Sequence, residues 1–419
     1  MPDRFLRRQV ITAALTANAL RPFPGYWAGI PTMAAGWLTT ELAPHLAAVT
    51  AADTLTELTL RRRDGHARKQ AVGLAVASIA GLAYLMRESQ GAKDDVEGAL
   101  IEALGEKYRE ELTKVYTDID MATPWQQLAM PFRIQHPEVD VVKNITYAGR
   151  GSRRGLLDIY RPAGGPVEGA PVLLQVHGGG WTIGTKDQQG IPLMLHMAAR
   201  GWVCVAINYR LSPKHPFPTH LVDVKRSIAW IRENIEQYGG DPSYVAITGG
   251  SAGGHLTALA ALTPNDPEYQ PGFEGADTTV QAAVPHYGVY DFAGVGGDRR
   301  TVKMRDAFLG PHVLKKDPAL DLADFERASP LLRVSPDAPP FFVLHGAHDS
   351  LVPVAQAREF VRRLREVSKN PVAYAELPGT QHAFDVFPSI RSAHVVRGVD
   401  RFLRWNYGRW KDSPQRSSA

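Results

Sequence analysis

A serine between glycines, placed between a strand-like run and a helix-like run, is the feature of this sequence that most restricts its fold. The pentapeptide GGSAG at 249–253 follows the apolar run 244–248 and precedes the helix-like run 255–262. This strand–turn–helix order is typical of a nucleophile elbow, in which a serine hydroxyl stands above the edge of a sheet. The flanking glycines fit so sharp a turn because they carry no side chain that could clash. We therefore expect Ser251 on a strained turn at the end of a strand.

From about residue 140 onward, strand-like and helix-like segments alternate. Several strand-like runs are continuously apolar, as expected of strands that are covered on both faces. Helix-like segments fall between them, for example at 221–238 and 354–367. The pattern predicts an α/β fold with a mostly parallel sheet, and the active site of such a sheet lies beyond the carboxyl ends of its strands. The predicted strands are 156–160, 172–176, 203–208, 245–248, 282–286, 341–344 and 373–377.

The chain has 419 residues, which is large for a single domain. We divide it into an N-terminal helical extension (1–130), a catalytic domain (131–410) and a polar tail (411–419). The extension has no strand-like alternation, and we expect its helices to break at the four prolines between residues 22 and 44. Its clearest helix is predicted to begin after Asp94 with a capping-box-like start. The extension could serve as a cap over the active site or as a membrane-associating unit.

The segment 71–86 is apolar except for Ser78 and follows a group of basic residues. As a helix it would be about 24 Å long at about 1.5 Å per residue, which is less than the roughly 30 Å core of a bilayer. Three interpretations stay open: a helix buried in the protein, which we prefer, insertion at a membrane surface, and a full span. The basic N-terminus precedes only a short apolar run without a convincing cleavage site, so we expect no cleavable signal peptide. The chain is accordingly expected to be cytoplasmic or membrane-associated.

Two residues beyond later strands complete a candidate catalytic triad. A serine hydroxyl needs a base to take its proton, and that base needs an acid to orient it and to stabilise its charge. His382 follows the predicted strand 373–377, and Asp349 follows the strand 341–344, in the chain order serine, acid, histidine. We therefore assign Asp349 and His382 to Ser251. The nearby His345, His348 and Asp385 are the weaker alternatives.

A glycine-rich loop follows the predicted strand 172–176 and can supply an oxyanion hole. Its sequence is HGGGW at 177–181. Backbone amides in such a loop, together with the amide of the residue after the nucleophile, stabilise a tetrahedral oxyanion. The predicted donors are Gly178, Gly179, Gly180 and Ala252. Neither the glycine spacing of a dinucleotide site nor a Walker lysine is present, so the phosphate-binding interpretation of this loop has little support.

Charge and metal-ligand patterns exclude other classes of function. The net charge is +4, and the basic residues are scattered apart from the group near Arg61–Arg63. No basic stripe is interleaved with aromatic residues, so we predict no nucleic-acid partner. No cluster of histidine, cysteine and acidic residues has metal-ligand spacing, and we predict neither a metal nor another cofactor.

Together these motifs resemble the hormone-sensitive-lipase-like branch of the α/β-hydrolases, and more narrowly the mycobacterial Lip-type esterases. The resemblance covers about residues 140–407. It includes the segment YRLSPKHPFP at 209–218, which is close to the family signature YRLAPEHPFP. It implies an eight-stranded sheet, a helical cap and cofactor-free hydrolysis of carboxylic esters. In this resemblance Ser251, Asp349 and His382 take the triad roles.

One departure from the family pattern lies beside the nucleophile. Many members have an acidic residue directly before the serine, in the sequence GDSAGG, and this chain has Gly250 there. The change leaves the triad intact and puts the fine substrate preference in question. The long N-terminal extension is a second departure.

The sequence thus predicts a serine carboxylesterase that acts on small-molecule or lipid esters with short to medium acyl chains. An amidase or arylformamidase with the same triad, and a non-catalytic ligand-binding protein of the same fold, are the alternatives. Membrane-surface contact through 71–86 stays open, as do the natural ester and the oligomeric state. Four aromatic residues near strand ends are candidates for the acyl pocket: Trp181, Tyr290, Phe292 and Phe384.

Overall fold

The structure is a computed structural model of the chain. It describes residues 4–23, 25, 27–60, 66–112, 122–149, 151–165 and 168–413. The arginine group at 61–63 and residues 414–419 of the predicted tail lie outside the described residues.

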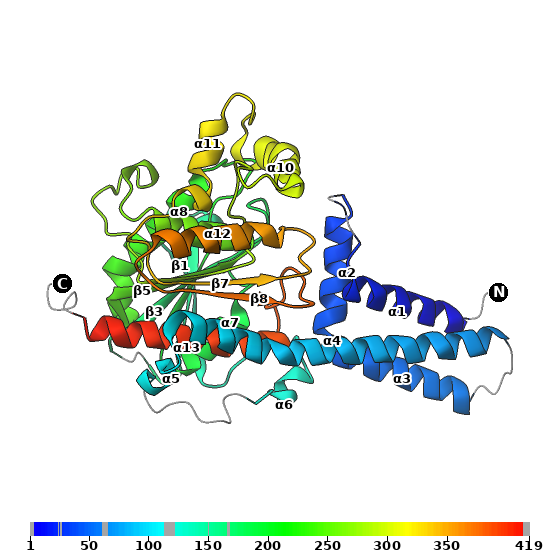
Figure 1. Cartoon of the computed structure of the whole chain (residues 1–419). Coiled ribbons are helices and arrows are strands. Elements are labelled where there is room, and N and C mark those ends of the chain that lie inside the picture. The colour runs from blue at the N-terminus through cyan, green and yellow to red at the C-terminus, as the bar shows by residue number, and fades with distance from the viewer. Residues whose placement is uncertain are drawn as a thin grey trace.

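An eight-stranded, mostly parallel sheet forms the centre of the catalytic region (Figure 1). Its strand order is β1-β2-β4-β3-β5-β6-β7-β8, in which β2 pairs antiparallel with β1 and β4 and the remaining pairs are parallel. This confirms the predicted α/β-hydrolase fold. The strands are β1 (Val139–Thr146), β2 (Leu156–Pro162), β3 (Ala170–Val176), β4 (Val203–Ile207), β5 (Gly240–Gly250), β6 (Ala282–His286), β7 (Phe341–Gly346) and β8 (Val372–Leu377).

Helices cover both faces of the sheet. The helices α7 and α13 pack on one face, and α8, α9 and α12 pack on the other, so that two apolar cores lie against the two faces of the strands (Figure 1). Between β6 and β7 an insertion with α10, the π-helical segment η5 and α11 stands over the catalytic region. The helices here are α5 (Tyr108–Glu111), α6 (Trp125–Leu128), α7 (Ile191–Ala199), α8 (Thr219–Asn234), α9 (Ala252–Leu262), α10 (Arg299–Met304), η5 (Arg305–Leu314), α11 (Leu322–Arg327), α12 (Val354–Val367) and α13 (Ile390–Lys411).

The N-terminal region is helical and projects from the side of the sheet (Figure 1). It contains α1 (Arg4–Leu20), α2 (Gly29–Glu41), α3 (Ala43–Thr59) and α4 (His66–Leu104). We call α1, α2, α3 and residues 66–86 of α4 the N-terminal module. The second half of α4 packs against α13 and β8, which ties the module to the catalytic region.

Two expectations about these helices are wrong. No helix begins after Asp94, because α4 runs without interruption through that position and Glu97 instead binds the hydroxyl of Tyr108 at 2.7 Å. The break expected at Pro44 is confirmed, because α2 ends at Glu41 and α3 begins at Ala43, but Pro31 does not break a helix and lies in the first turn of α2. Proline is tolerated there because the amide groups of the first turn have no partner within the helix.

A buried ion pair joins α2 to the start of α13. Glu41 binds Arg391, and the hydroxyl of Ser389 donates to the Glu41 carboxylate at 2.6 Å. The Arg391 side chain is fully buried, and Glu41 is 5% exposed. Removing one partner would therefore leave an uncompensated charge in the interior.

We expect Arg391→Met to lower the free energy of unfolding by about 3–5 kcal/mol, because Glu41 would stay buried without its partner. Urea unfolding followed by circular dichroism measures this. The double variant Glu41→Leu/Arg391→Met is the control, and it should recover much of the loss because no unpaired charge remains. A single variant as stable as the wild type would show that the pair contributes nothing to the folded state.

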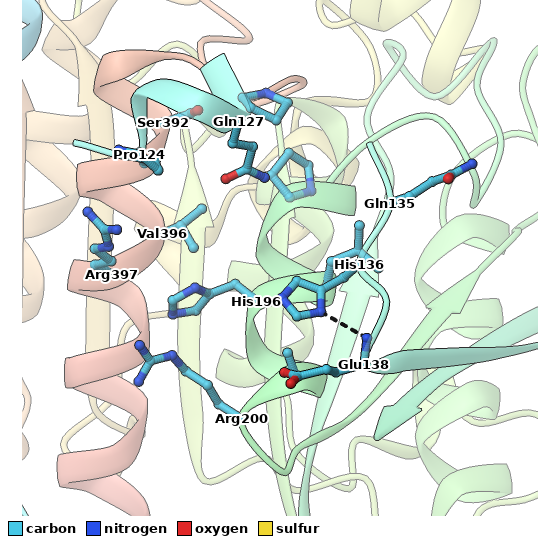
Figure 2. Close-up of a pocket in the computed structure, with 15 residues that line it drawn as sticks. Pro124, Gln127, Gln135, His136, Glu138, His196, Arg200, Ser392, Val396 and Arg397 are labelled. Atoms are coloured by element: carbon cyan, nitrogen blue, oxygen red, sulfur yellow. Dashed lines mark hydrogen bonds between the residues drawn. The ribbon is translucent and has the colours of Figure 1, made fainter. Parts of the chain in front are cut away.

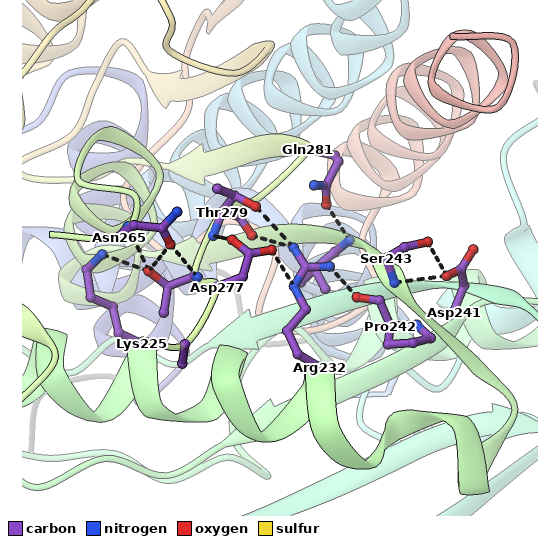
Figure 3. Close-up of polar contacts among 12 residues, drawn as sticks. Lys225, Arg232, Asp241, Pro242, Ser243, Asn265, Asp277, Thr279 and Gln281 are labelled. Carbon is purple, nitrogen blue, oxygen red and sulfur yellow. Dashed lines mark hydrogen bonds and ion pairs between the residues drawn. The ribbon is translucent and has the colours of Figure 1, made fainter. Parts of the chain in front are cut away.

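A polar network lies at the end of the sheet away from Ser251, where β5 and β6 begin (Figure 3). Lys225 of α8 is fully buried and donates to the carbonyl of Thr263 and, at 3.3 Å, to the hydroxyl of Thr278. Arg232 of the same helix lies 3.3 Å from Asp277 and donates to the carbonyl of Thr279 at 2.8 Å. Burial lowers the pKa of Lys225 to about 8. This network fixes α8 to the sheet at the end away from Ser251.

Candidate active site

Ser251 occupies the turn between β5 and α9. Its backbone has φ +58° and ψ −120°, a sparsely populated combination for a residue with a side chain. A methyl group at Gly249 would lie 2.5 Å from the carbonyl oxygen of Val176, and one at Gly253 would lie 2.1 Å from the same oxygen. Both positions therefore require glycine, and the turn has the strained geometry expected of a nucleophile elbow.

Asp349 and His382 form a buried hydrogen-bonded pair beyond β7 and β8. His382 Nδ1 lies 2.6 Å from Asp349 Oδ2, and the side chains are 4% and 0% exposed. The other carboxylate oxygen of Asp349 accepts the amides of Leu351 and Val352 at 2.8 Å each. The structure thus brings together the acid and the base that the sequence placed on two separate loops.

The pKa of Asp349 lies well below its ordinary value. Burial opposes this shift, but the facing imidazole of His382 and hydrogen bonds from His345 and His382 outweigh it. The carboxylate is therefore ionised at neutral pH and acts only as a hydrogen-bond acceptor. An ionised acceptor at Nδ1 holds the imidazole in the tautomer whose Nε2 can take a proton.

Tyr287 connects this pair to the serine turn. Its ring centroid lies 4.5 Å from that of His382. The same ring also lies against the backbone of Gly250, because a methyl group there would come within 2.6 Å of the tyrosine oxygen. The imidazole of His382 and the residue before Ser251 therefore contact one side chain. Tyr287 was not among the predicted site residues, although it follows directly after the predicted strand 282–286.

The alternative residues have other partners. Asp385 Oδ2 lies 2.9 Å from Nδ1 of His286, and its other oxygen accepts the hydroxyl of Tyr287. Nε2 of His345 lies 3.1 Å from the carbonyl oxygen of Val352 and 3.3 Å from Asp349. Asp385 therefore belongs to a neighbouring pair, and His345 supports the loop that carries the candidate acid.

The predicted oxyanion loop follows β3, and one of its amides is already engaged. The amide of Gly178 donates to Oε1 of Gln189 at 2.7 Å, a contact that sequence analysis did not predict. Gly179 and Gly180 follow with φ +113° and +57°, conformations that favour glycine. The hydrogen bond from Gly178 to Gln189 thus stabilises the conformation of the loop. Of the oxyanion donors predicted in this loop, Gly179 and Gly180 remain candidates, together with Ala252 at the start of α9.

Tyr209, the first residue of the segment 209–218, packs against the glycine-rich loop 177–181. The Tyr209 hydroxyl donates to the carbonyl of His177 at 2.8 Å, and the two rings stack with centroids 4.2 Å apart. Burial lowers the pKa of His177 to about 4, so its ring is neutral at neutral pH. Nδ1 of His177 lies 2.7 Å from the carbonyl oxygen of Gly178. These contacts hold the glycine loop in place, which agrees with a supporting role for His177.

All four aromatic residues predicted for the acyl pocket are buried. Trp181 packs edge-on against Phe292 at 5.1 Å, and Tyr290 stacks on Phe360 at 4.4 Å. Phe384 packs against Tyr287 at 5.3 Å. Phe308 of η5, which sequence analysis did not single out, lies over the oxyanion loop, because a methyl group at Gly180 would be 3.3 Å from its ring. That the four predicted aromatic residues line the acyl pocket stays a prediction. Phe308 is a further candidate for this pocket.

The N-terminal module also touches the catalytic loops. A methyl group at Gly29 of α2 would lie 2.8 Å from the carbonyl oxygen of Ser350, the residue after Asp349. One at Gly36 would lie 3.1 Å from Gln381, the residue before His382. The helix α2 therefore lies directly against both loops, and the absence of side chains at these glycines permits the close approach.

Gly250, the departure from the family pattern, is explained by Tyr287. The tyrosine ring occupies the space that a side chain at position 250 would need, with contacts of 2.6 and 2.8 Å to a methyl group built there. We expect Gly250→Asp to lower the free energy of unfolding by about 1–3 kcal/mol, as measured by urea unfolding, because the core would be overpacked. Gly250→Asp/Tyr287→Ala, compared with Tyr287→Ala alone, should show a smaller effect. Equal effects of the aspartate in both backgrounds would contradict this explanation.

A separate cavity of about 370 Å³ lies between residues 124–138 and the helices α7 and α13 (Figure 2). His196 of α7 and Arg200, directly after that helix, line the cavity, as do Val396 and Arg397 of α13. None of the three candidate triad residues lines it. The cavity is therefore distinct from the candidate active site.

Comparison with known proteins identifies related ester hydrolases, one of which matches nearly the whole chain. The family model described as BD-FAE matches residues 157–364. The probable carboxylic ester hydrolase LipM of Mycobacterium tuberculosis is 45% identical over 398 residues, which cover 94% of this chain and 91% of the relative. The esterase LipQ of the same organism is 52% identical over 262 residues, 62% of each chain.

Solved structures match the catalytic region. A truncated carbohydrate esterase from gut microbiota superposes with a TM-score of 0.54 at 25% identity and covers 64% of this chain and 96% of its own. A thermophilic esterase from Thermogutta terrifontis with butyrate bound has a TM-score of 0.53 at 25% identity and covers 64% of this chain and 94% of its own. The similarity to LipM, by contrast, spans 94% of the chain and so includes most of the N-terminal region.

Proposed function

Because this chain belongs to the Lip-type carboxylic ester hydrolases of the α/β-hydrolase superfamily, we propose that it hydrolyses short- to medium-chain esters through an acyl-enzyme intermediate on Ser251. One observation carries this proposal. His382 and Asp349 form a buried pair at 2.6 Å, and Tyr287 links that pair to the strained turn of Ser251. A serine hydrolase requires an acid that orients its base, and this pair supports the assignment of those two roles to Asp349 and His382.

In the proposed first half-reaction, Nε2 of His382 takes the proton of the Ser251 hydroxyl as the oxygen attacks the ester carbonyl. Asp349 holds Nδ1–H and stabilises the imidazolium. The amides of Gly179, Gly180 and Ala252 donate to the oxyanion of the tetrahedral intermediate, and each such donor contributes roughly 3 kcal/mol. His382 then protonates the departing alcohol.

In the second half-reaction, water attacks the acyl-enzyme. His382 again acts as the base, and the same amides hold the oxyanion. Collapse of the second intermediate releases the carboxylic acid and returns the proton to Ser251. No cofactor takes part in these steps.

The acyl-chain preference rests on two observations. Phe308 lies against Gly180 of the glycine loop, and the aromatic residues around Trp181 are buried. The related Thermogutta terrifontis esterase was solved with butyrate bound, and butyrate is a short carboxylate. These observations favour acyl chains of butyrate to octanoate length over long-chain lipids.

A series of p-nitrophenyl esters from acetate to palmitate tests the proposal, with p-nitroanilides of matched acyl length as the amide arm. We expect kcat/KM to be highest for butyrate to octanoate and the anilides to be cleaved far more slowly. A preference for the anilides would favour the amidase alternative. A maximum at palmitate would contradict the proposed substrate class.

A further inference from the structure

The N-terminal module presents apolar side chains outward. On α4, every exposed residue between Gln70 and Arg87 is uncharged. Val76 is 61% exposed and Tyr84 is 53% exposed. The remaining exposed positions of this face carry small residues: Gly73, Ala77, Ala80 and Ala83. At about 1.5 Å per residue the uncharged face is about 25 Å long.

The helices α1 and α3, which pack on α4, repeat the pattern. The outward positions of α1 beyond Arg8 are apolar, and those of α3 are apolar or threonine. The largest exposed apolar side chains on these two helices are Val10, Ile11, Val49, Leu55 and Leu58. The module buries only a small core of its own, formed by Ala19, Ala43, Leu82 and Leu85.

Charge is segregated along the module. Its acidic residues among those described are Glu41 and Glu57, both buried, and Asp53, which binds Arg8 and Gln9. Exposed basic residues gather at the end away from the sheet, where α1 and α4 begin (Figure 1). These are Arg4, Arg7, Arg8 and Lys69, of which Arg8 is paired with Asp53. In the sequence, Arg61–Arg63 lie between α3 and α4, outside the described residues.

A helix of a soluble protein normally turns a polar face to water. The helix α4 is long and apolar enough to cross a bilayer, yet only 28% of its most apolar stretch is buried inside the protein. A core helix would be largely buried, so the interpretation of 71–86 as a helix buried in the protein does not fit. The basic end complements anionic lipid headgroups, which attract lysine and arginine near a membrane surface.

We propose that the N-terminal module inserts its apolar faces into a bilayer that contains anionic phospholipid, with its basic end among the headgroups. The catalytic region then stands at the membrane surface. A bilayer can cover the apolar faces of α1, α3 and α4 at once. This inference does not depend on the proposed function, because its test measures binding and not hydrolysis.

Flotation of the full-length protein tests the proposal, using phosphatidylcholine vesicles with and without phosphatidylglycerol. We expect the wild type to float with the anionic vesicles, to float less with phosphatidylcholine alone, and to stay bound after a high-salt wash because its apolar faces are inserted. Val76→Glu/Ala83→Glu places two carboxylates on the lipid face and should reduce flotation by roughly tenfold or more. The matched control is Leu320→Glu, which changes an 84%-exposed leucine of the catalytic region and should leave flotation unchanged.

Both variants should hydrolyse a water-soluble ester at the wild-type rate, which also shows that they are folded. A wild type that stays at the bottom of the gradient with both vesicle types would overturn the proposal, as would a double variant that floats like the wild type. A wild type that does not float but forms a dimer, which the double variant converts to a monomer, would assign the face to a second copy and equally overturn it.

Discussion

Ser251→Ala is expected to lower kcat for p-nitrophenyl butyrate by a factor on the order of 10⁴ or more while KM stays similar, because no other group on the turn can form the acyl-enzyme. Alanine fits the same backbone and removes only the hydroxyl, so the variant should unfold at the wild-type urea concentration. Steady-state kinetics and urea unfolding measure the two effects separately.

Ser243→Ala is the matched control for this experiment. Ser243 lies on the same strand, β5, where its hydroxyl binds Asp241 at the end away from the site. It should keep wild-type activity. If Ser251→Ala retained more than a small fraction of kcat, Ser251 could not be the nucleophile, whatever the activity of Ser243→Ala.

The second large effect is expected for Asp349→Asn, with a loss of kcat on the order of 10⁴-fold. An amide cannot stabilise the imidazolium, and its NH₂ group favours the tautomer of His382 with the proton on Nε2. Burial raises the pKa of the Asp349 carboxylate, but His382 and His345 outweigh burial and hold this pKa below its ordinary value. That shift also contributes stability, which is fully present above the ordinary pKa of aspartate and is lost as the pH falls toward the depressed value.

Asp385→Asn separates the two candidate acids. Asp385 faces His286 and Tyr287, and it lies only three residues beyond His382 in the chain. The substitution should reduce kcat by less than about tenfold, the range of a residue that acts through its neighbours. A large loss for Asp385→Asn together with a small loss for Asp349→Asn would reverse the assignment of the acid.

The residues at the rim of the sheet could be predicted because parallel strands end at one edge. Ser251, Asp349, His382 and the loop 177–181 each follow a run of apolar residues, so the fold had to bring those loops to the same side. The strand β1 was missed for the opposite reason. It is an edge strand that pairs only with β2, and its exposed Lys143 and Asn144 interrupt the apolar pattern.

Contacts between distant segments could not be predicted from local patterns. The hydrogen bond from the Gly178 amide to Gln189 depends on the path of the chain over the next eleven residues. The requirement for glycine at 250 depends on Tyr287, which follows the neighbouring strand β6. At Asp94 a plausible helix start was overridden, because packing against α13 and β8 stabilises one continuous α4. In each case contacts between distant segments determined a local feature that the neighbouring residues alone did not specify.

The central claim is that Ser251 is the nucleophile, and covalent trapping tests it most directly. The full-length protein is incubated with a fluorophosphonate, and the intact mass and peptide map are measured. We predict one adduct per chain, located on Ser251, and no adduct on Ser251→Ala. Hydrolysis of p-nitrophenyl butyrate that continues in the presence of the reagent, or an adduct at a different residue that abolishes activity, would contradict the account.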